Sequence, residues 1–399
     1  MRYKTRFAAF FFVTVIFWLA SNFAHPVTPT IIQNLQLHDY MFGVALAAMM
    51  LTNFLVSPFW GKINGYISSR VTLLIGCLGY GIAQLWFAYA TTELMIILAR
   101  MFAGLFTGGI FVSFLTYVVN VSKPEDQAKF LTYSATIKSV AGAFGYLIGG
   151  FLGEISVRLS FLAQAVTLIA TGFLFFLICL PDETEERQKF SAKQLAKEAN
   201  PFQAFIDSRY FMSAAFVFLF AVNILINFGN TGFDQAFNYY LKDELGLSSS
   251  YNGILKALVG FISFAANMTL CIWIINKTQV KRSMVILVAA CAASALGTTL
   301  PVNIVLFIIF SVIVYAGYSV AVPVLQSMVA GQAETSQKNL VMGFFNATQS
   351  LGSIAGSLTA GLIYSLHAKL PFACTFVIYT AGALAALGYL MYHRKSDSQ

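Results

Sequence analysis

Apolar runs of about 20 residues recur along the whole chain, and this feature restricts its fold more than any other. A helix of about 20 apolar residues crosses the ~30 Å hydrocarbon core of a bilayer. Each run is continuously apolar rather than alternating, which favours helices over barrel strands. We predict twelve membrane spans, at residues 7–33, 40–61, 71–90, 93–120, 128–152, 157–181, 210–236, 252–276, 282–300, 302–331, 338–366 and 370–392.

Charged residues are too scarce for a water-soluble protein. They make up 10% of the 399 residues, whereas a soluble domain carries about 25%. This deficit excludes a soluble enzyme, a nucleic-acid-binding protein and a disordered scaffold. We therefore expect an all-α integral membrane protein that is surrounded by lipid and has no nucleic-acid partner.

The positions of lysine and arginine predict the orientation in the membrane. Of the 24 basic residues, 18 fall in the two termini and in the alternate loops that share their side, and three fall in the opposite loops. Basic residues concentrate on the cytoplasmic side of membrane proteins. We expect both termini in the cytoplasm, and the net charge of +8 mainly reflects this topology.

The first apolar run follows Arg2, Lys4 and Arg6, as the core of a signal peptide does. It is longer than such a core, however, contains Pro26 and Pro29, and lacks a small-residue cleavage site. We therefore expect it to be the first span.

A charged segment divides the predicted spans into two groups of six. We predict an N-terminal six-helix bundle at 1–181, a cytoplasmic charged linker at 182–209 and a C-terminal six-helix bundle at 210–399. The linker is expected to contain a short surface helix near 191–199. Five single cysteines show neither metal-ligand spacing nor a disulfide framework, so we expect no metal and no cofactor.

The two halves show weak internal repetition in the same order along the chain. The matches align 43–61 with 253–271, 102–104 with 315–317, and Gly145 and Gly150 with Gly356 and Gly361. Their offsets are 210, 213 and 211 residues. Two parallel six-helix repeats are typical of a large transporter group that holds its substrate between the halves.

Short motifs connect the chain with a known family. They are His25-Pro26-Val27-Thr28-Pro29, Ser57-Pro58-Phe59-Trp60-Gly61-Lys62, Ala99-Arg100-Met101-Phe102-Ala103-Gly104, and the glycine-rich segment from Gly142 to Glu154. Together they resemble the major facilitator superfamily, and within it the twelve-helix drug:proton antiporter branch that includes tetracycline and multidrug exporters. The resemblance covers the whole chain and implies transport by rocking of the two halves. It assigns gating roles to Gly61, Arg70, Gly104, Gly142, Gly145, Gly149 and Gly150.

The chain departs from the family pattern at three motif positions. Gly65 replaces an aspartate that helps to latch the halves, Ser68 replaces a glycine, and Tyr146 replaces a proline. The first span also lacks the acid that many exporters of cationic drugs carry. The resemblance therefore implies a different latch and speaks against a cationic substrate.

Polar residues recur at helical spacing on five predicted spans, and residues so spaced share one face. The stripes are Trp18/Asn22/His25/Pro29, Lys138/Gly142/Gly145/Gly149, Asn223/Asn227/Asn230/Asp234, Lys256/Gly260/Ser263/Asn267 and Asn346/Ser350/Ser353/Ser357. They fit either a shared polar cavity or hydrogen bonds that join helices. We favour the cavity, with Asn22, His25, Lys138, Asn223, Asn227, Asn230, Ser263, Asn267 and Asn346 as candidate substrate contacts.

Ionisable residues inside spans carry more weight, because each costs ~2.5–3.5 kcal/mol to insert near the bilayer centre. Lys138 lies about ten residues into its span, too deep for its ammonium to reach water easily. The embedded charge consists of three cations (Arg100, Lys138 and Lys256) and one acid (Asp234). A cavity of that sign favours an anionic or zwitterionic substrate.

Four residues are candidates for proton coupling and charge compensation: His25, Arg100, Asp234 and Lys256. One hypothesis is that His25 or Asp234 carries the proton and Arg100 biases its release. Alternatively, His25 makes a structural hydrogen bond, and Asp234 and Lys256 form an ion pair.

These observations predict a monomeric secondary transporter in a bacterial plasma membrane. We expect proton-coupled export of a drug-like anionic or zwitterionic small molecule by alternating access. The alternative on the same fold is an uptake symporter or facilitator of a small polar solute. A membrane-embedded enzyme would need paired acids, a metal cluster or a nucleophile–histidine pair, and a receptor would usually carry a soluble domain. We expect neither a membrane-embedded enzyme nor a receptor.

Overall fold

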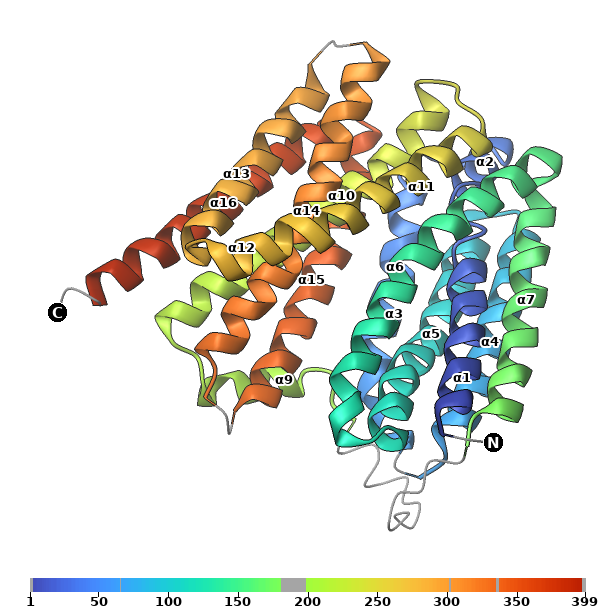
Figure 1. Ribbon diagram of the computed structural model, residues 1–399. Helices are drawn as coiled ribbons and strands as arrows, with labels where there is room; N and C mark the ends of the chain where they lie inside the picture. The colour runs from blue at the N-terminus through green and yellow to red at the C-terminus, as the bar shows by residue number, and fades with distance from the viewer. Residues whose placement is uncertain (1–2, 65, 181–198, 301–302, 335–336, 397–399) are drawn as a thin grey trace. The chain divides into compact units, whose positions relative to one another are not determined.

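The computed structural model describes residues 3–64, 66–180, 199–300, 303–334 and 337–396, and within these ranges it contains helices and no strand. The surface helix expected near 191–199 lies largely outside the described residues. Figure 1 shows the helices along the chain. They are α1 (Tyr3–Ser21), α2 (Thr28–Asn34), α3 (Met41–Ile63), α4 (Ser69–Ala88), α5 (Glu93–Val121), α6 (Pro124–Ile155), α7 (Val157–Ile178), α9 (Gln203–Asp207), η1 (Ser208–Tyr210), α10 (Ala214–Asp243), α11 (Ser249–Ala266), η2 (Asn267–Cys271), α12 (Ile272–Lys277), α13 (Val280–Thr299), α14 (Ile304–Gln332), α15 (Lys338–Tyr364) and α16 (Leu370–Ser396).

The helices have the length and the surface of membrane spans. In the described part of the chain, nine helices or helix runs are long and apolar enough to cross a bilayer. Large apolar side chains lie exposed on them, as Leu94, Val166, Leu177 and Trp273 illustrate. Such exposure is unfavourable in water and natural in lipid. Each of the twelve predicted spans coincides with a helix or a run of helices, and the total of twelve spans stays a prediction.

The first predicted span is broken where a single helix was expected. α1 ends at Ser21, a turn follows, and α2 begins at Thr28. Pro29 lies in the first turn of α2, where its missing N–H and fixed φ are tolerated. Pro26 lies in the turn itself. This position suits a proline, because a proline inside a helix would break the backbone hydrogen-bond ladder. His25 therefore lies in this turn and not on a helical stripe.

The eighth predicted span also departs from a regular helix. It is composed of α11, the π-helical segment η2 and α12. A π-turn widens the helix locally and is often found at functional sites. The second span, α3, contains Pro58 within the helix.

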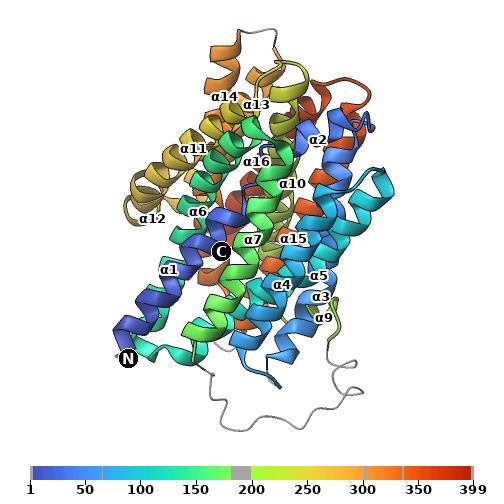
Figure 2. The same ribbon diagram turned by 90° about the vertical axis from the view of Figure 1, so that its right-hand side faces the viewer.

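Contacts between Cα atoms divide the chain into two compact units. The first comprises Met1–Leu37, Ala48–Pro201 and Leu241–Gly260, and the second comprises His38–Ala47, Phe202–Tyr240 and Phe261–Gln399. In the first unit α4 packs against α5 and α7, while α1 packs against α6 and α7. In the second, α13 packs against α14 and α16, and α14 packs against α15. Figure 2 gives a second view of these helices. The predicted boundaries at 181 and 210 remain a prediction.

Equivalent glycines pack in the same way in the two units. A methyl group added to Gly145 would lie 2.9 Å from the Cβ atom of Asn22, and the carbonyl of Leu19 is still closer. A methyl group on Gly356 would lie 2.8 Å from the carbonyl carbon of Phe228. In each unit a glycine thus lets two helix backbones approach, α6 on α1 and α15 on α10. The shared contact supports the internal repeat.

Aromatic rings fill the interior of both units. In the first unit Phe10, Tyr117 and Phe175 are almost fully buried and lie ring against ring. In the second unit the rings of Phe233 and Phe372 meet edge to face, 5.3 Å apart. Large rings packed edge to face hold neighbouring helices at fixed distances, because each buries much apolar area in a defined geometry.

Candidate functional site

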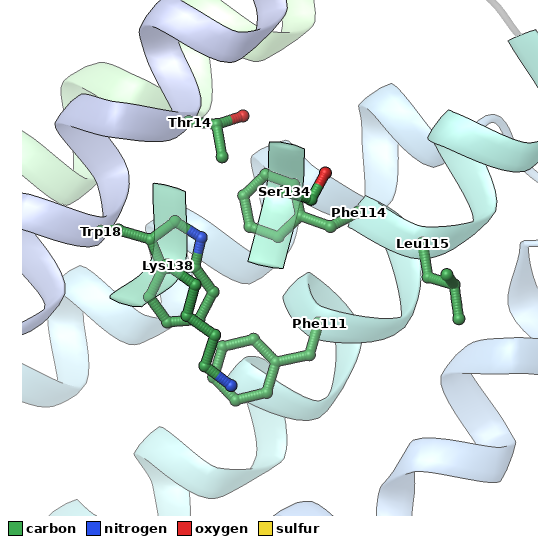
Figure 3. A pocket seen from close by; sticks show the side chains of 7 residues that line it. All are labelled: Thr14, Trp18, Phe111, Phe114, Leu115, Ser134 and Lys138. Carbon is green, nitrogen blue, oxygen red and sulfur yellow. The ribbon is translucent and has the colours of Figure 1, made fainter. Parts of the chain in front are cut away.

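A pocket with a volume of about 240 Å³ lies within the first unit, between α1, α5 and α6. It contains one ammonium group, two hydroxyl groups and several large apolar side chains, as Figure 3 shows. The lining residues are Thr14, Trp18, Phe111, Phe114, Leu115, Ser134 and Lys138. The candidate substrate residue Lys138 therefore lines an open space in the first unit, and the shared cavity of the five stripes stays a prediction.

The ammonium of Lys138 lies over two aromatic rings. Its Nζ atom is 5.1 Å from the ring centroid of Trp18 and 5.6 Å from that of Phe111. These two rings are stacked, with centroids 5.5 Å apart and planes 16° apart. A cation over a ring face is attracted by the ring quadrupole. The two rings thus hold the lysine in place without neutralising its charge.

Tyr146, at the motif position where the family carries proline, lies against a histidine of the turn after α1 and a lysine of α11. Its ring stacks on the imidazole of His25 with centroids 5.3 Å apart. The Nζ atom of Lys256 lies 5.6 Å from the centroid of the same ring. Tyr146 therefore connects two of the four predicted coupling residues, His25 and Lys256.

Arg100 is buried in the first unit. Its guanidinium lies 4.3 Å from the ring centroid of Phe87, and Nη1 is 3.8 Å from the sulfur of Met49. Its Nε atom is buried without a hydrogen-bond partner. Such a buried cation is costly unless its surroundings compensate it, and the ring of Phe87 contributes to that as a cation–π partner.

In the second unit, two asparagines of α10 form hydrogen bonds between helices. The Nδ2 atom of Asn223 donates to the carbonyl of Phe345 (2.8 Å) and to the hydroxyl of Thr348 (2.9 Å). Asn227 donates to the Oδ1 atom of Asn223 (3.0 Å) and accepts from the hydroxyl of Tyr318 (2.7 Å). Both asparagine side chains are fully buried. These contacts match the helix-joining interpretation of the stripe better than the cavity.

The acid of the same stripe has a tyrosine partner. The hydroxyl of Tyr315 donates to Oδ1 of Asp234 (2.9 Å), and Gln235 lies 3.4 Å from the other carboxylate oxygen. One turn earlier, the Oδ1 atom of Asn230 is buried without a hydrogen-bond partner. Asp234 is half-buried. The C-terminal half of α10 therefore carries the carboxylate of Asp234 one turn after the Oδ1 atom of Asn230, which lacks a hydrogen-bond partner.

The remaining predicted substrate residues occupy varied positions. Asn22 donates to the carbonyl of Trp18 (2.8 Å), and Asn267 donates to the carbonyl of Ser263 (3.1 Å), so both bond within their own helical segment. Asn346 is exposed. The predicted ion pair of Asp234 with Lys256 stays a prediction.

Several predicted gating residues mark close helix contacts. A methyl group on Gly104 would lie 2.9 Å from the Cβ of Thr52, whereas one on Gly61 would have Val112 at 3.8 Å. The Arg70 guanidinium lies 5.0 Å from the ring of Phe176. Gly65, the position of the missing latch acid, lies outside the described residues.

Gly150 brings the α6 and α11 backbones together. A methyl group on Gly253 would lie 2.6 Å from the carbonyl oxygen of Tyr146 and 3.3 Å from the Cα atom of Gly150. At the start of α11, the carboxylate of Glu154 accepts from the backbone N–H of Ser250 (2.9 Å). A carboxylate at a helix N-terminus complements the helix dipole.

Sequence reasoning missed the tyrosines. Tyr315 and Tyr318 bond to predicted residues, yet they are two of 18 tyrosines and lie in a uniformly apolar run. Phe111 is likewise one of 39 phenylalanines.

The Major Facilitator Superfamily profile matches residues 10–314 and 228–399. The chain belongs to the Major Facilitator Superfamily. The predicted membership and the all-helical membrane fold are thereby confirmed. The protein is accordingly a multi-pass membrane transporter and not an enzyme.

Curated relatives from this superfamily span nearly the whole chain. The quinolone resistance protein NorA of Staphylococcus aureus (strain Mu50 / ATCC 700699) is 23% identical over 400 residues, covering 96% of each chain. The multidrug resistance protein 1 of Bacillus subtilis (strain 168) is 22% identical over 378 residues, covering 94% of this chain and 93% of that one.

Solved superfamily structures share the fold at low identity. A bacterial homologue of the human lysosomal transporter Spinster matches with a TM-score of 0.76 and 13% identity, covering 98% of each chain. A bacterial homologue of the iron transporter ferroportin matches with a TM-score of 0.77 and 11% identity, covering 98% and 99%.

Proposed function

We propose that this superfamily member exports a small drug-like compound, anionic or zwitterionic, in exchange for protons and by alternating access. The observation that carries the proposal is Lys138, a cation on a predicted span whose ammonium faces an open pocket. Ionisable residues within membrane spans commonly line substrate or ion pathways. The direction is supported by the relatives, which are named for quinolone and multidrug resistance.

The coupling part of the proposal assigns the proton to Asp234. It is the acid among the four deeply placed ionisable residues of the sequence, and the Tyr315 hydroxyl fixes its orientation. Its carboxylate would carry a proton in one state and release it in the other. Three basic residues would balance the charge of the substrate, which is the other partner of the exchange. They are Arg100 and the two residues that lie against Tyr146, His25 and Lys256.

The substrate contacts belong to the same proposal. Lys138 would contact the anionic group, and Asn22, Asn230, Ser263, Asn267 and Asn346 would offer further polar contacts. We place the protein in the plasma membrane as a monomer with both termini in the cytoplasm, as the basic residues predict. An uptake symporter or a facilitator of a small polar solute is the alternative.

Proteoliposomes separate these functions. The purified protein is reconstituted with a pH-sensitive dye inside, and norfloxacin, a quinolone with a carboxylate and an amine, is added outside without a pH gradient. Proton exchange makes the lumen more alkaline as the compound enters, symport makes it more acidic, and a facilitator leaves the pH unchanged. Because the cell's proton gradient points inward, exchange corresponds to export. Acidification would establish the uptake alternative, and protein-free liposomes correct for passive entry.

A further inference from the structure

The pocket of the first unit has the composition of a selective binding site. Its lining residues all belong to this unit and come from α1, α5 and α6. The flat wall is formed by Trp18 and Phe111, whose planes are 16° apart, and Phe114 lies near Trp18 at 26°. Three rings in similar orientations form a surface on which another flat ring can stack.

The hydroxyl groups of the pocket donate to their own helices. Thr14 donates to the carbonyl of Phe10 (2.8 Å), and Ser134 donates to the carbonyl of Phe130 (3.0 Å). Their hydrogens are therefore already engaged. Among the seven lining residues, Lys138 is the charged donor that a ligand meets.

The position of the lysine decides which charge the pocket accepts. Aromatic rings alone attract cations, as in sites for quaternary ammonium ligands. Here the Lys138 ammonium already lies over both ring faces and would repel a second cation. An anion beside this ammonium gains a charge-assisted hydrogen bond, which is about twice as strong as one between neutral groups.

The volume indicates how large a part of a ligand the pocket can enclose. About 240 Å³ lies just below the ~300–1,000 Å³ of sites for drug-sized molecules. One or two fused rings fit better than a larger, flexible molecule.

We propose that this pocket binds a compact, flat aromatic carboxylate, with the ring on Trp18 and Phe111 and the carboxylate on Lys138. The assignment deepens the proposed function, on which it rests for the transport of that ligand. Binding itself requires neither a proton gradient nor a direction. Failure of proton exchange and failure of ligand recognition are therefore separate results.

Calorimetry on the full-length protein in detergent tests the proposal with four matched probes: 2-naphthoate, 2-naphthalenemethanol, 2-naphthylmethylamine and cyclohexanecarboxylate. We expect 2-naphthoate to bind at least tenfold more tightly than the other three, because it alone has both a flat aromatic ring and an anionic group. Equal binding of the amine, or no binding of 2-naphthoate, would overturn the proposal on the wild-type protein alone. Empty micelles correct for partitioning.

Variants then test which residue recognises the carboxylate of the ligand and which recognises its aromatic ring. Lys138→Gln should weaken 2-naphthoate about tenfold and leave the neutral alcohol unchanged, while Lys138→Arg should retain most of the affinity. Trp18→Leu should weaken 2-naphthoate and 2-naphthalenemethanol by a similar factor. The matched controls are Lys369→Gln, whose ammonium lies 4.6 Å from the ring of Phe307 in the second unit, and Trp86→Leu on α4. If Lys138→Gln binds 2-naphthoate as the wild type does, the lysine has no part in recognition.

Discussion

The hydroxyl group of Tyr315 donates a 2.9 Å hydrogen bond to the carboxylate of Asp234, although the two residues lie 81 positions apart in the chain. The tyrosine ring is itself held by edge-to-face contacts with Phe233 and Phe237, at 5.5 and 5.6 Å. The acid is thus oriented by a side chain that has little freedom to move. A proton-carrying carboxylate benefits from such a fixed partner, because its geometry is the same in every transport cycle.

Asp234→Asn should separate proton coupling from substrate movement. The amide keeps the shape and an oxygen that accepts from Tyr315, but it cannot exchange a proton. We expect substrate-for-substrate exchange in proteoliposomes to stay within about twofold of the wild type, while proton-driven norfloxacin transport is lost. Tyr315→Phe should lower the driven rate less, because the carboxylate remains. Driven transport that persists in Asp234→Asn would remove this residue from the coupling role.

Asn223→Ala should destabilise the second unit. The change removes both interhelical hydrogen bonds of the Asn223 amide, to Phe345 and Thr348. Interhelical hydrogen bonds in membrane proteins average ~0.6 kcal/mol, so the free energy of unfolding should fall by about 1–2 kcal/mol. Thermal unfolding in detergent measures the loss. The matched control is Asn346→Ala, whose exposed side chain lies in the same unit and which should unfold at the wild-type temperature.

Gly253→Ala should weaken the packing of α11 on α6. The added methyl group would lie 2.6 Å from the carbonyl oxygen of Tyr146, so the two backbones must separate. Overpacking of this kind costs about 1–3 kcal/mol. Gly343→Ala is the control, because no neighbouring atom lies within 4 Å of its new methyl group. It should leave the melting temperature unchanged or raise it slightly, whereas an equal loss in both variants would contradict the contact.

Tyr146→Leu should uncouple α6 from Lys256 and His25. The leucine removes the ring that lies 5.6 Å below the Lys256 ammonium and stacks on His25, whereas Tyr146→Phe keeps it. A desolvated cation–π contact is worth ~2 kcal/mol. In a double-mutant cycle of Tyr146→Leu with Lys256→Met, unfolding should report a coupling of about 1–2 kcal/mol. A coupling near zero would show that Lys256 does not depend on the ring.

The sequence allowed the helices to be predicted well, because the bilayer sets both their length and their apolar character. α5, expected at 93–120, is observed at Glu93–Val121. The break after Ser21 was not anticipated, although Pro26 and Pro29 mark it. Two prolines three residues apart do not by themselves distinguish a kinked helix from two helices.

The stripes predicted which residues share a face but not what that face touches. Asn223 and Asn227 are joined by a hydrogen bond, as the spacing of four residues implies. Their partners Thr348 and Tyr318 lie 125 and 91 residues away. The relative rotation of distant helices depends on side-chain packing across the interface, and one apolar run carries little information about it.

The proline within α3 and the π-helical segment η2 occupy equivalent positions in the second and eighth predicted spans. The offset of 210 residues that aligns Gly43 with Gly253 carries Pro58 onto Met268, which lies inside the π-helical segment Asn267–Cys271. A proline cannot donate its backbone nitrogen, and a π-turn replaces the usual ladder with a wider one, so both are places where helices bend. Each repeat therefore has its own point of low bending stiffness in the same helix, produced by different means. A substitution that restored a regular helix at one of these points would leave the other unchanged.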